Sequence, residues 1–495
     1  MERTKWQKQH KWMGIIFSFF MIMFCLSGIV LNHRSSVSDI DISRKWLPDR
    51  YRYDKWNGGL LRGTTTYKVE ADSCVLIYGS AGIWKTDTAA SRVTDFNNGL
   101  PGGSDRRQIR NVVQIPDSSL YAASIFGLYR YDGSNEDWRL VSLPKGDDEM
   151  LTDVVSRNDT LIAVGRSCLY ISTAPYKSFR RIQLQQPDDY RNKVSLFRTI
   201  WLLHGGGLFG IPGRIFMDIV AVILIGICIT GLIYWLLPKY VRRRRREGAT
   251  ADAAVRITRK SFLWHEKLGR ATIILTLFVA ISGWCLRPPV LILLALTKVP
   301  AIPGTHLYST NPWNDKLRML RYDDDCRDWI LSTSEGFYSL KTLDSTPVPI
   351  NHAPPVSVMG LNVFQKDKSG NWLCGSFSGM SVWDRKHDRI TDHFTGEPAS
   401  DKAGPPFGKR AVSGYSSDLS VGAFTVEHYK GTEAIPQPVE LEELPMSLYG
   451  IALEVHNGRF YMGAVATYVF VFLSGILAVW ILWSGWKLRI RSRQK

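Results

Sequence analysis

Four long apolar runs constrain the fold of this chain more than any other feature. The first, Trp12 to Leu31, is twenty residues without a charged side chain. A run of this length crosses a hydrocarbon layer about 30 Å thick as a helix. The others run from Ile215 to Leu237, from Ala271 to Leu286 with an extension back to Phe262, and from Phe460 to Trp486. Because each backbone group in hydrocarbon must find its partner within the segment, we expect four membrane helices.

The basic residues predict the orientation of these helices. Segments 1–11, 239–260 and 486–495 hold eighteen Lys or Arg against three acidic residues, which is most of the net charge of +17. Short basic flanks mark the cytoplasmic side of a membrane protein. We therefore expect a multi-pass inner-membrane protein in a lipid bilayer, with cytoplasmic termini and large periplasmic domains. This distribution of charge argues against nucleic-acid binding.

The expected domain order alternates membrane helices with extramembrane segments. The cytoplasmic N-terminus and helix 1 are followed by a β-rich half, helix 2, a basic cytoplasmic loop, helix 3, an interfacial helix with a second β-rich half, and helix 4 with a basic tail. The corresponding ranges are 1–33, 34–200, 201–238, 239–260, 261–287, 288–455 and 456–495.

A short phrase recurs in both extramembrane segments. It reads YGSAGIW, ASIFGLY and VGRSCLY in the first segment, and STSEGFYSL and GSFSGMSVW in the second. Aromatic or aliphatic residues around a small-residue turn predict a β-hairpin, and the spacings of 45, 41 and 43 residues are typical of propeller blades. The stretch KDKSGNWLCGSFSGMSVWD resembles the propeller repeats of two-component sensor ectodomains. We expect an all-β periplasmic domain, a β-propeller assembled from the two inserts; a β-sandwich is the alternative.

The membrane helices also repeat. In each half, one histidine precedes a Ser-Gly pair by seventeen residues, and a second precedes Thr-Gly or Ser-Gly by 26 or 28 residues. Each second histidine has a glycine two places later. The four sets are His10 with Ser27-Gly28, His265 with Ser282-Gly283, His204 with Thr230-Gly231 and His456 with Ser484-Gly485. The pattern predicts a four-helix core made of two parallel-related repeats.

These histidines are candidate cofactor ligands. The topology places His10 and His265 at the cytoplasmic ends of helices, and His204 and His456 at the outer ends. Equivalent residues of a two-fold repeat approach each other near its axis, and two imidazoles are axial ligands of a b-type haem. We expect two haem b groups, one on the cytoplasmic-side pair and one on the periplasmic-side pair. Glycines in the helices would make room for the macrocycle or pack the helices closely. A lone interfacial histidine needs no ligand, and this alternative stays open.

Two further residues are candidates for catalysis. His33 lies at the outer end of the first apolar run and has no counterpart, because Pro288 occupies the equivalent position. Asp218 is an ionisable group inside a predicted helix, which marks it as a candidate proton relay or haem contact. Its alternative role is an ion pair with Arg214, four residues earlier on the same helix face.

The four apolar regions resemble the PepSY-associated transmembrane helix family. The stretches that carry the resemblance are HKWMGIIFSFFMIMFCLSG, LLHGGGLFGIPGRIFMDIVAVILIGICITGLIYW, HEKLGRATIILTLFVAISG and VHNGRFYMG. The family includes inner-membrane ferric-siderophore reductases with b-type haems, so the resemblance implies electron transfer to iron chelates in the periplasm. His10, His204, His265 and His456 fall on its histidine motifs. No PepSY domain is evident outside the membrane, where the β-rich inserts stand instead.

Two functional hypotheses follow from these features. The first is a haem-dependent oxidoreductase, a di-haem electron conduit that reduces ferric iron in a siderophore or other chelate for iron acquisition. Short cytoplasmic segments without a GxGxxG motif exclude a self-contained NAD(P)H reductase, so membrane quinol or a separate reductase would supply electrons. The second is a non-redox scaffold or sensor whose propeller binds a periplasmic protein or ligand. The absence of CxxCH argues against covalently attached haem, and disulfides among the extramembrane cysteines are left open.

Overall fold

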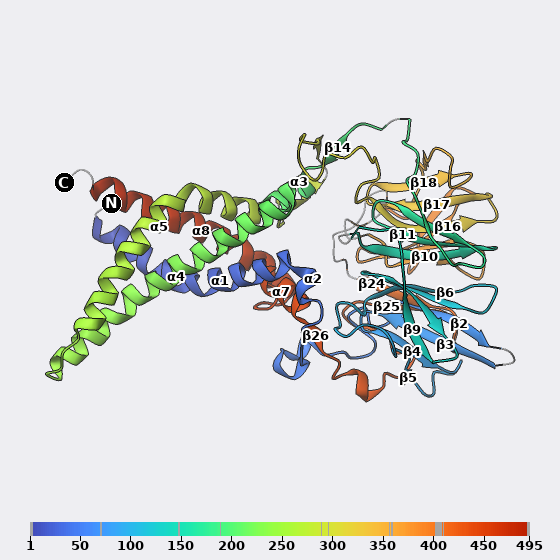
Figure 1. Cartoon of the computed structure of the whole chain (residues 1–495), viewed down its shortest axis with the longest axis horizontal. Helices are drawn as coiled ribbons and strands as arrows, with labels where there is room; N and C mark the ends of the chain where they lie inside the picture. The colour runs from blue at the N-terminus through green and yellow to red at the C-terminus, as the bar shows by residue number, and fades with distance from the viewer. Residues whose placement is uncertain are drawn as a thin grey trace. The chain divides into compact units, whose positions relative to one another are not determined.

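The computed structural model of the chain contains a helical unit and a β-rich unit (Figure 1). The helical unit comprises Met1–Val37, Asn192–Tyr308 and Leu448–Lys495, and the β-rich unit comprises Ser38–Arg191 and Ser309–Ser447. The structure describes residues 3–69, 72–146, 149–188, 190–288, 290–295, 297–355, 357, 360–400, 408 and 410–492. Both inserts between the membrane helices therefore contribute to one β-rich unit.

Four long helices form the core of the helical unit. They are α1 (Arg3–Asn32), α4 (Gly210–Arg246), α5 (Asp252–Cys285) and α8 (Ala464–Ser492). All four are long and apolar enough to cross a membrane. α1 and α5 each pack against both α4 and α8. The helices thus enclose a common interior, and α1 and α5 lie on opposite sides of it.

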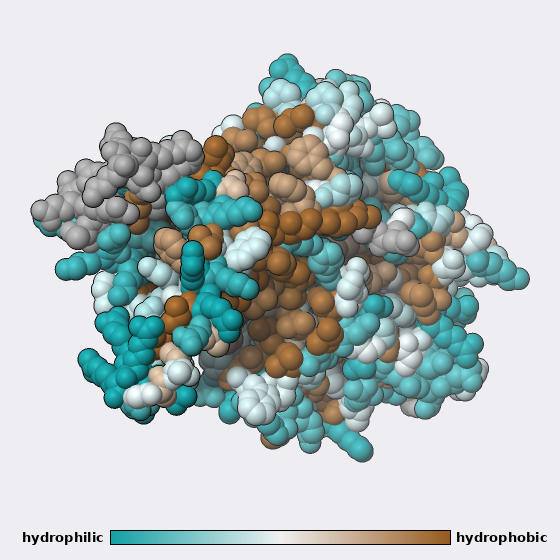
Figure 2. Space-filling model, turned by 60° about the vertical axis from the view of Figure 1, so that its left-hand side comes forward, coloured by the Kyte–Doolittle hydropathy of each residue, from teal (hydrophilic) through white to brown (hydrophobic). Residues whose placement is uncertain are grey.

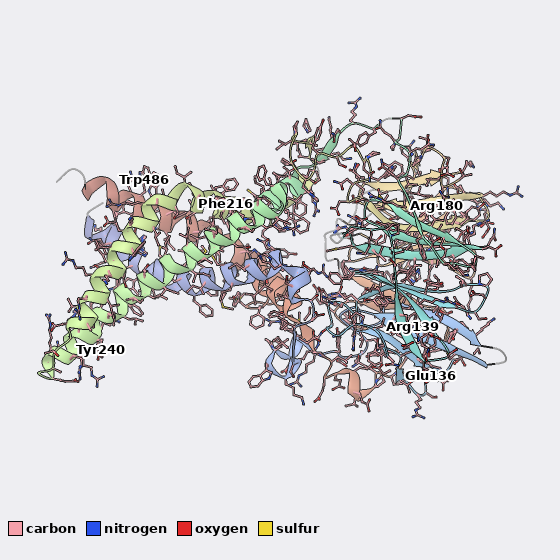
Figure 3. All side chains as sticks on the ribbon, viewed as in Figure 1. Glu136, Arg139, Arg180, Phe216, Tyr240 and Trp486 are labelled. Carbon is pink, nitrogen blue, oxygen red and sulfur yellow. The ribbon has the colours of Figure 1, made fainter. Side chains whose placement is uncertain are left out.

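The outward faces of these helices are apolar. Figure 2 shows hydrophobic side chains gathered on the helical unit. Phe216 projects from α4 and Trp486 from α8 (Figure 3), with 52% and 37% of their surfaces exposed. Other large exposed apolar residues on these helices are Ile16, Phe19, Ile219, Val222, Ile274, Val469 and Leu473. Such a surface suits contact with lipid rather than water.

Helices extend through most of the basic segment 239–260, where the sequence suggested a loop. α4 continues to Arg246 and α5 begins at Asp252, so only residues 247–251 between them are outside a helix. Arginine is a good helix former, and a cluster of arginines at a helix C-terminus complements the negative end of the helix dipole. Glu247 adds an ion pair with Arg243, with Oε1 and Nε 3.0 Å apart.

Short elements cap the end of the helical unit from which both inserts leave the chain's helices, and we refer to this as the outer end. They are α2 (Arg34–Val37), α3 (Leu196–His204), η3 (Gly207–Phe209), α6 (Val290–Ala295) and α7 (Leu448–His456). α6 lies near the start of segment 288–455, where we expected an interfacial helix. Strands β14 (Lys193–Ser195) and β15 (Lys298–Pro300) pair antiparallel and join the segments before α3 and after α6.

The β-rich unit contains five four-stranded antiparallel sheets and one two-stranded sheet among its described residues, besides the short pair β1 (Asp41–Ile42) and β26 (Met446–Ser447). The first insert supplies β2 (Gly63–Val69), β3 (Asp72–Gly79), β4 (Gly82–Thr86), β5 (Thr94–Asp95), β6 (Ile109–Gln114), β7 (Leu120–Ser124), β8 (Leu128–Asp132), β9 (Asp137–Val141), β10 (Leu151–Arg157), β11 (Thr160–Gly165), β12 (Leu169–Thr173) and β13 (Arg180–Ile182). The second supplies β16 (Leu317–Asp323), β17 (Asp328–Thr333), β18 (Gly336–Leu340), β19 (Val348–Pro349), β20 (Val363–Lys366), β21 (Trp372–Ser376), β22 (Gly379–Asp384), β23 (Arg389–Asp392), β24 (Val412–Ser416) and β25 (Phe424–Glu427).

The recurring phrase is the hairpin between the second and third strands of each four-stranded sheet. This prediction is confirmed by the pairs β3–β4, β7–β8, β11–β12, β17–β18 and β21–β22. Gly82, Gly336 and Gly379 open the third strand with φ of 124°, 136° and 134°. L side chains rarely adopt these angles, which explains glycine at those turns.

Successive sheets pack against one another. The first strands make contacts in the order β2, β6, β10, β16, β20 and β24, and β24 also contacts β2. A separate buried apolar cluster fills each of these six interfaces; for example, Leu76, Ile83 and Leu120 lie between the first and second sheets. All seven cysteines are free. The unit is thus held together by apolar cores rather than by disulfides.

Candidate functional site

The first predicted histidine pair meets inside the helical core. His10 of α1 and His265 of α5 have ring centroids 6.2 Å apart and ring planes at 70°. Because α1 and α5 lie on opposite sides of the core, these rings meet across its interior. We refer to His10 and His265 as the inner pair.

The second predicted pair also meets, but it lies on separate short helices. His204 is the last residue of α3 and His456 is the last residue of α7. Their ring centroids are 6.1 Å apart and the ring planes are at 53°. We refer to His204 and His456 as the outer pair. The sequence suggested the outer ends of the spanning helices themselves; instead, a turn separates each histidine from α4 or α8.

Two matched glycines make these turns. Gly206 and Gly458, each two residues after an outer histidine, both have φ of 78°. A glycine in this left-handed conformation commonly ends a helix. A Cβ on Gly206 would lie 2.1 Å from the carbonyl oxygen of Gly213, so a larger residue does not fit there. The glycines identified in the sequence repeat therefore set where each histidine-bearing helix stops.

Nδ1 of every one of the four imidazoles lies against a neighbouring helix. It is 3.0 Å from the Ser484 hydroxyl for His10, 3.0 Å from the Ser282 hydroxyl for His204, 3.1 Å from the Ser27 hydroxyl for His456, and 2.9 Å from the Ile227 carbonyl for His265. A carbonyl can only accept a hydrogen bond, so Nδ1 of His265 carries its proton. Such a bond fixes the ring and leaves Nε2 as the nitrogen available to a metal.

The Ser-Gly and Thr-Gly pairs of the repeat form the surface on which the rings lie. An added Cβ would be 3.3 Å from Cε1 of the histidine at Gly28 and Gly485, 3.1 Å at Gly231 and 2.8 Å at Gly283. These glycines let the imidazoles approach the helix backbone closely. We expected glycines in the helices either to make room for a macrocycle or to allow close packing, and these four allow the close packing of the imidazoles.

Other glycines leave open space beside the inner pair. Gly14 and Gly269 follow His10 and His265 by four residues, so each lies one turn away on the same helix face. A Cβ at either position would meet no atom within 4 Å. Gly475, in contrast, packs against the ring of Trp284, with the nearest atom 2.5 Å from an added Cβ.

The spacing of both pairs fits a shared iron. A nitrogen of each imidazole lies about 2 Å from a metal and the ring centre about 1 Å behind it, so two rings on opposite sides of one iron have centroids about 6 Å apart. The observed separations are 6.2 and 6.1 Å. The donor set and the spacing are therefore compatible with haem at both pairs, and the open space by Gly14 and Gly269 adds to this at the inner pair.

The outer pair is also electrostatically suited to bind a metal, because a metal ligand must be the neutral imidazole. Burial, with a smaller contribution from the positive charge of Arg287, lowers the pKa of His204 to about 4. Burial, with smaller contributions from His204 and Arg287, lowers the pKa of His456 to about 3. Both rings are therefore neutral at physiological pH.

The two candidate catalytic residues contact each other. Nε2 of His33 lies 2.6 Å from Oδ2 of Asp218, and Nδ2 of Asn32 donates to Oδ1 at 3.0 Å. The alternative partner Arg214 makes no ion pair with Asp218 in the described structure. The side chains of His33 and Asp218 are 44% and 18% exposed, so this contact is accessible from the outer end of the helical unit.

The PepSY-associated TM region family matches residues 7–491, which is nearly the whole chain. The chain belongs to this family. It is accordingly a membrane protein with four candidate spans and a β-sheet-rich domain. No curated protein matches it significantly in sequence.

Several solved structures share a limited likeness with this family member. The extracellular domain of BT4673 from B. thetaiotaomicron, a one-component system, has 10% identity and a TM-score of 0.32, with 77% of this chain and 39% of that chain covered. The extracellular domain of BT3049, a hybrid two-component system, has 8% identity and a TM-score of 0.35, with 76% and 39% covered. PorZ of the Porphyromonas gingivalis type-IX secretion system has 12% identity and a TM-score of 0.30, with 74% and 31% covered. The chain thus spans about two fifths or less of these structures.

Proposed function

We propose that this protein is a di-haem electron conduit of the inner membrane that reduces ferric iron, held in a siderophore or other chelate, at the periplasmic face. The observation that carries the proposal is the meeting of two imidazole pairs, one inside the helical core and one on the short helices at its outer end, with centroid separations of 6.2 and 6.1 Å. A haem iron bound by two imidazoles alternates between its ferric and ferrous states and so carries one electron.

The distance between the pairs supports transfer across a membrane. Seventeen residues of α1 separate His10 from Ser27, whose hydroxyl contacts His456. At 1.5 Å per helical residue this is about 25 Å, comparable to the hydrocarbon thickness of about 30 Å. The inner and outer pairs would therefore lie near opposite faces of the bilayer.

Apolar side chains occupy the helices between the two pairs. Cys25, Val220 and Leu224 form a buried cluster that packs α1 against α4. A dry interior of this kind keeps water and ions out of the path between the pairs, so that only electrons need to cross. The four Nδ1 contacts hold the imidazoles in fixed orientations, which limits reorganisation during transfer.

His33 and Asp218 are placed to handle protons where the iron chelate would be reduced. The exposed imidazole of His33 can deliver a proton to an oxygen of the chelate, and Asp218 can stabilise the imidazolium through the 2.6 Å contact. Ferrous iron is held less tightly than ferric iron by hard oxygen ligands, and protonation of those ligands favours release. Arg214 is then a bystander in this chemistry.

The electrons would come from membrane quinol or a separate reductase. Oxidation of one quinol to quinone releases two electrons and two protons, which suffices for two ferric ions. The five residues 247–251 between α4 and α5 form a short turn, so a donor would approach the inner pair from the lipid or from the cytoplasmic ends of the helices.

We also infer that the β-rich unit is a six-bladed propeller on the periplasmic side. Side chains in or next to the first two strands of each sheet support a closed ring, because each interface has a polar contact in addition to its apolar cluster. The contacts are Tyr78 to Asn111 at 2.8 Å, Asn111 to Asp153 at 3.0 Å, Arg321 to Asp153, Arg321 to the Phe364 carbonyl at 2.9 Å, Asn362 to the Val412 carbonyl at 2.9 Å and Thr64 to Ser416 at 2.9 Å.

A cross-link tests the closure of the ring. Thr64 in β2 and Ser416 in β24 come from different inserts, and their hydroxyl oxygens are 2.9 Å apart. The Thr64→Cys/Ser416→Cys double variant should form a disulfide that joins the first and last sheets. In the control, Thr65→Cys/Ser416→Cys, the new thiol points to the opposite face of β2 and should remain free. A ring that does not close would leave both variants reduced.

The absorption spectrum of the detergent-purified full-length protein tests the function. A Soret band with sharp α and β bands on reduction, reoxidised by a ferric chelate, is expected. A colourless protein after haem supplementation would rule out the conduit and favour the scaffold or sensor hypothesis.

A further inference from the structure

Arg287 lies beside the outer pair. It follows the end of α5 by two residues and comes four residues after Gly283, which packs against the ring of His204. The positive charge of Arg287 acts on both His204 and His456. The same turn of chain that supports one outer histidine therefore also brings a guanidinium close to both rings.

This guanidinium makes no side-chain hydrogen bond or ion pair within the described part of the chain. Its neighbour Arg459 differs, because it contacts the carboxylate of Glu454 through Nε at 3.1 Å to both oxygens and through Nη2. Burial lowers the pKa of Arg287 to about 10, and the charge of Arg459 adds to this effect. The carboxylate of Glu454 acts against this lowering, but Arg459 already binds it, so one carboxylate faces two guanidinium groups. An uncompensated positive charge in a largely buried position is unfavourable, so the structure has a place for a further negative charge here.

The repeat has an acid at one position of the first half that is missing from the second. The equivalent of Arg287 in the first half is Asn32, which donates to Asp218 at 3.0 Å. The offset between Thr230 and Ser484 places Phe472 at the position equivalent to Asp218. The second half thus has a stronger donor than the first and no carboxylate at the position equivalent to Asp218.

We propose that Arg287 anchors a carboxylate supplied by a ligand beside the outer histidine pair. One source is a propionate of a haem held by His204 and His456, and in that form the inference rests on the proposed function. The other source is a carboxylate-bearing solute that enters from the outer face, for which citrate is a suitable probe. A guanidinium binds either carboxylate by the same paired hydrogen bonds.

Three full-length variants in detergent test the inference. Arg287→Gln removes the positive charge, and Arg287→Lys keeps the charge but lacks the planar guanidinium. The control is Arg214→Gln, which changes an arginine at the outer end of α4. Outer-haem affinity should fall roughly tenfold or more in Arg287→Gln, the loss expected for a hydrogen bond to a charged group. The lysine variant should be intermediate and Arg214→Gln unchanged.

Two further measurements separate the two sources. The reduction potential of the outer haem should fall in Arg287→Gln, because a nearby positive charge favours the reduced form, while the inner haem keeps its potential. Haem dimethyl ester, which lacks free propionates, should bind the wild type as weakly as haem binds Arg287→Gln. If haem binding is unaffected but calorimetry shows that Arg287→Gln loses citrate binding, the carboxylate comes from a solute.

The inference and the proposed function can fail separately. The carboxylate site is overturned if Arg287→Gln binds both haem and citrate as tightly as the wild type does. The conduit would be unaffected by that result. A wild-type protein that binds no haem would remove the conduit, and citrate calorimetry alone would then decide: loss of citrate binding in Arg287→Gln supports the site, and no citrate binding by the wild type overturns it.

Discussion

The inner and outer pairs have nearly the same spacing but different supports. His10 and His265 lie within continuous spanning helices, whereas His204 and His456 end separate nine-residue helices. The outer end also carries polar residues that the repeat does not duplicate, namely Asn32, His33, Asp218 and Arg287. The symmetric features are those that would hold the proposed cofactor, and the asymmetric ones gather at the outer end, where the proposed substrate would react.

This difference separates the residues that would hold a cofactor from those that would take part in the reaction. The Nδ1 contacts and the glycine surfaces recur around all four imidazoles, as expected if duplication of one half produced both cofactor sites. Asn32, His33 and Asp218 occur together in the first half only, and Arg287 stands alone in the second. Changes at shared positions should therefore alter haem content, and changes at the unshared ones should alter reactivity.

The largest expected effect is the loss of one haem. His204→Ala or His456→Ala should abolish the outer haem and keep the inner one, and His10→Ala or His265→Ala should do the reverse. Haem content per chain and separate redox titrations measure this. Loss of both haems from every variant would break the distinction between the pairs.

Gly283→Ala should come next in effect. Its Cβ would lie 2.8 Å from Cε1 of His204, so the ring must move. Overpacking of this kind typically costs about 1–3 kcal/mol, which we expect to appear as weaker outer-haem binding and a lower Tm. Gly226→Ala is the matched control, because its Cβ meets no atom within 4 Å. Equal behaviour of the two variants would contradict the contact.

Ser282→Ala removes the hydroxyl 3.0 Å from Nδ1 of His204. Loss of such a support typically lowers metal affinity about 10- to 100-fold. The variant should bind the outer haem less tightly in a haem titration and leave the inner haem unchanged. Ser474→Ala, in α8, serves as a control, and an effect of similar size there would point to general destabilisation.

Gly269→Ala should separate the stability of the helix from cofactor binding. Replacing glycine by alanine in an open helical position stabilises it by about 0.5–1 kcal/mol, so the Tm of the haem-free protein should rise. The inner haem should bind less tightly if its macrocycle occupies the space beside Gly269. Unchanged haem affinity would place the macrocycle elsewhere.

The smallest expected effect is that of Asp218→Asn. It leaves the histidine pairs intact but weakens the support of the His33 imidazolium, so chelate reduction should slow by a few fold at unchanged haem content. Stopped-flow reoxidation by a ferric chelate measures the rate, with Arg214→Gln as the control. A change in haem content instead would give Asp218 a structural role.

Much of this arrangement could be predicted from the sequence because it depends on periodic features. The lengths of the apolar runs predicted four membrane helices, and the duplicated histidines indicated which rings meet. The breaks after His204 and His456 were missed, although the matched Gly206 and Gly458, and the glycines and proline that follow His204, were signals for them. These breaks depend on the backbone conformation of Gly206 and Gly458.

Other features depend on contacts that no local pattern encodes. The sixth sheet, β24–β25, lacks the recurring phrase, and its strand β24 contacts β20 and β2 of the neighbouring sheets. The partner of Asp218 comes from another helix, so the nearby Arg214 was a poor guide. Likewise, the significance of Arg287 emerges only when its surroundings are compared with those of Asn32.

The central claim is that each histidine pair holds one haem, and its most direct test is the haem stoichiometry and low-temperature electron paramagnetic resonance spectrum of the full-length protein. We expect two haem b per chain with the low-spin signals of bis-imidazole ligation. A single haem, a high-spin signal from both sites, or protein free of haem after supplementation would contradict the account.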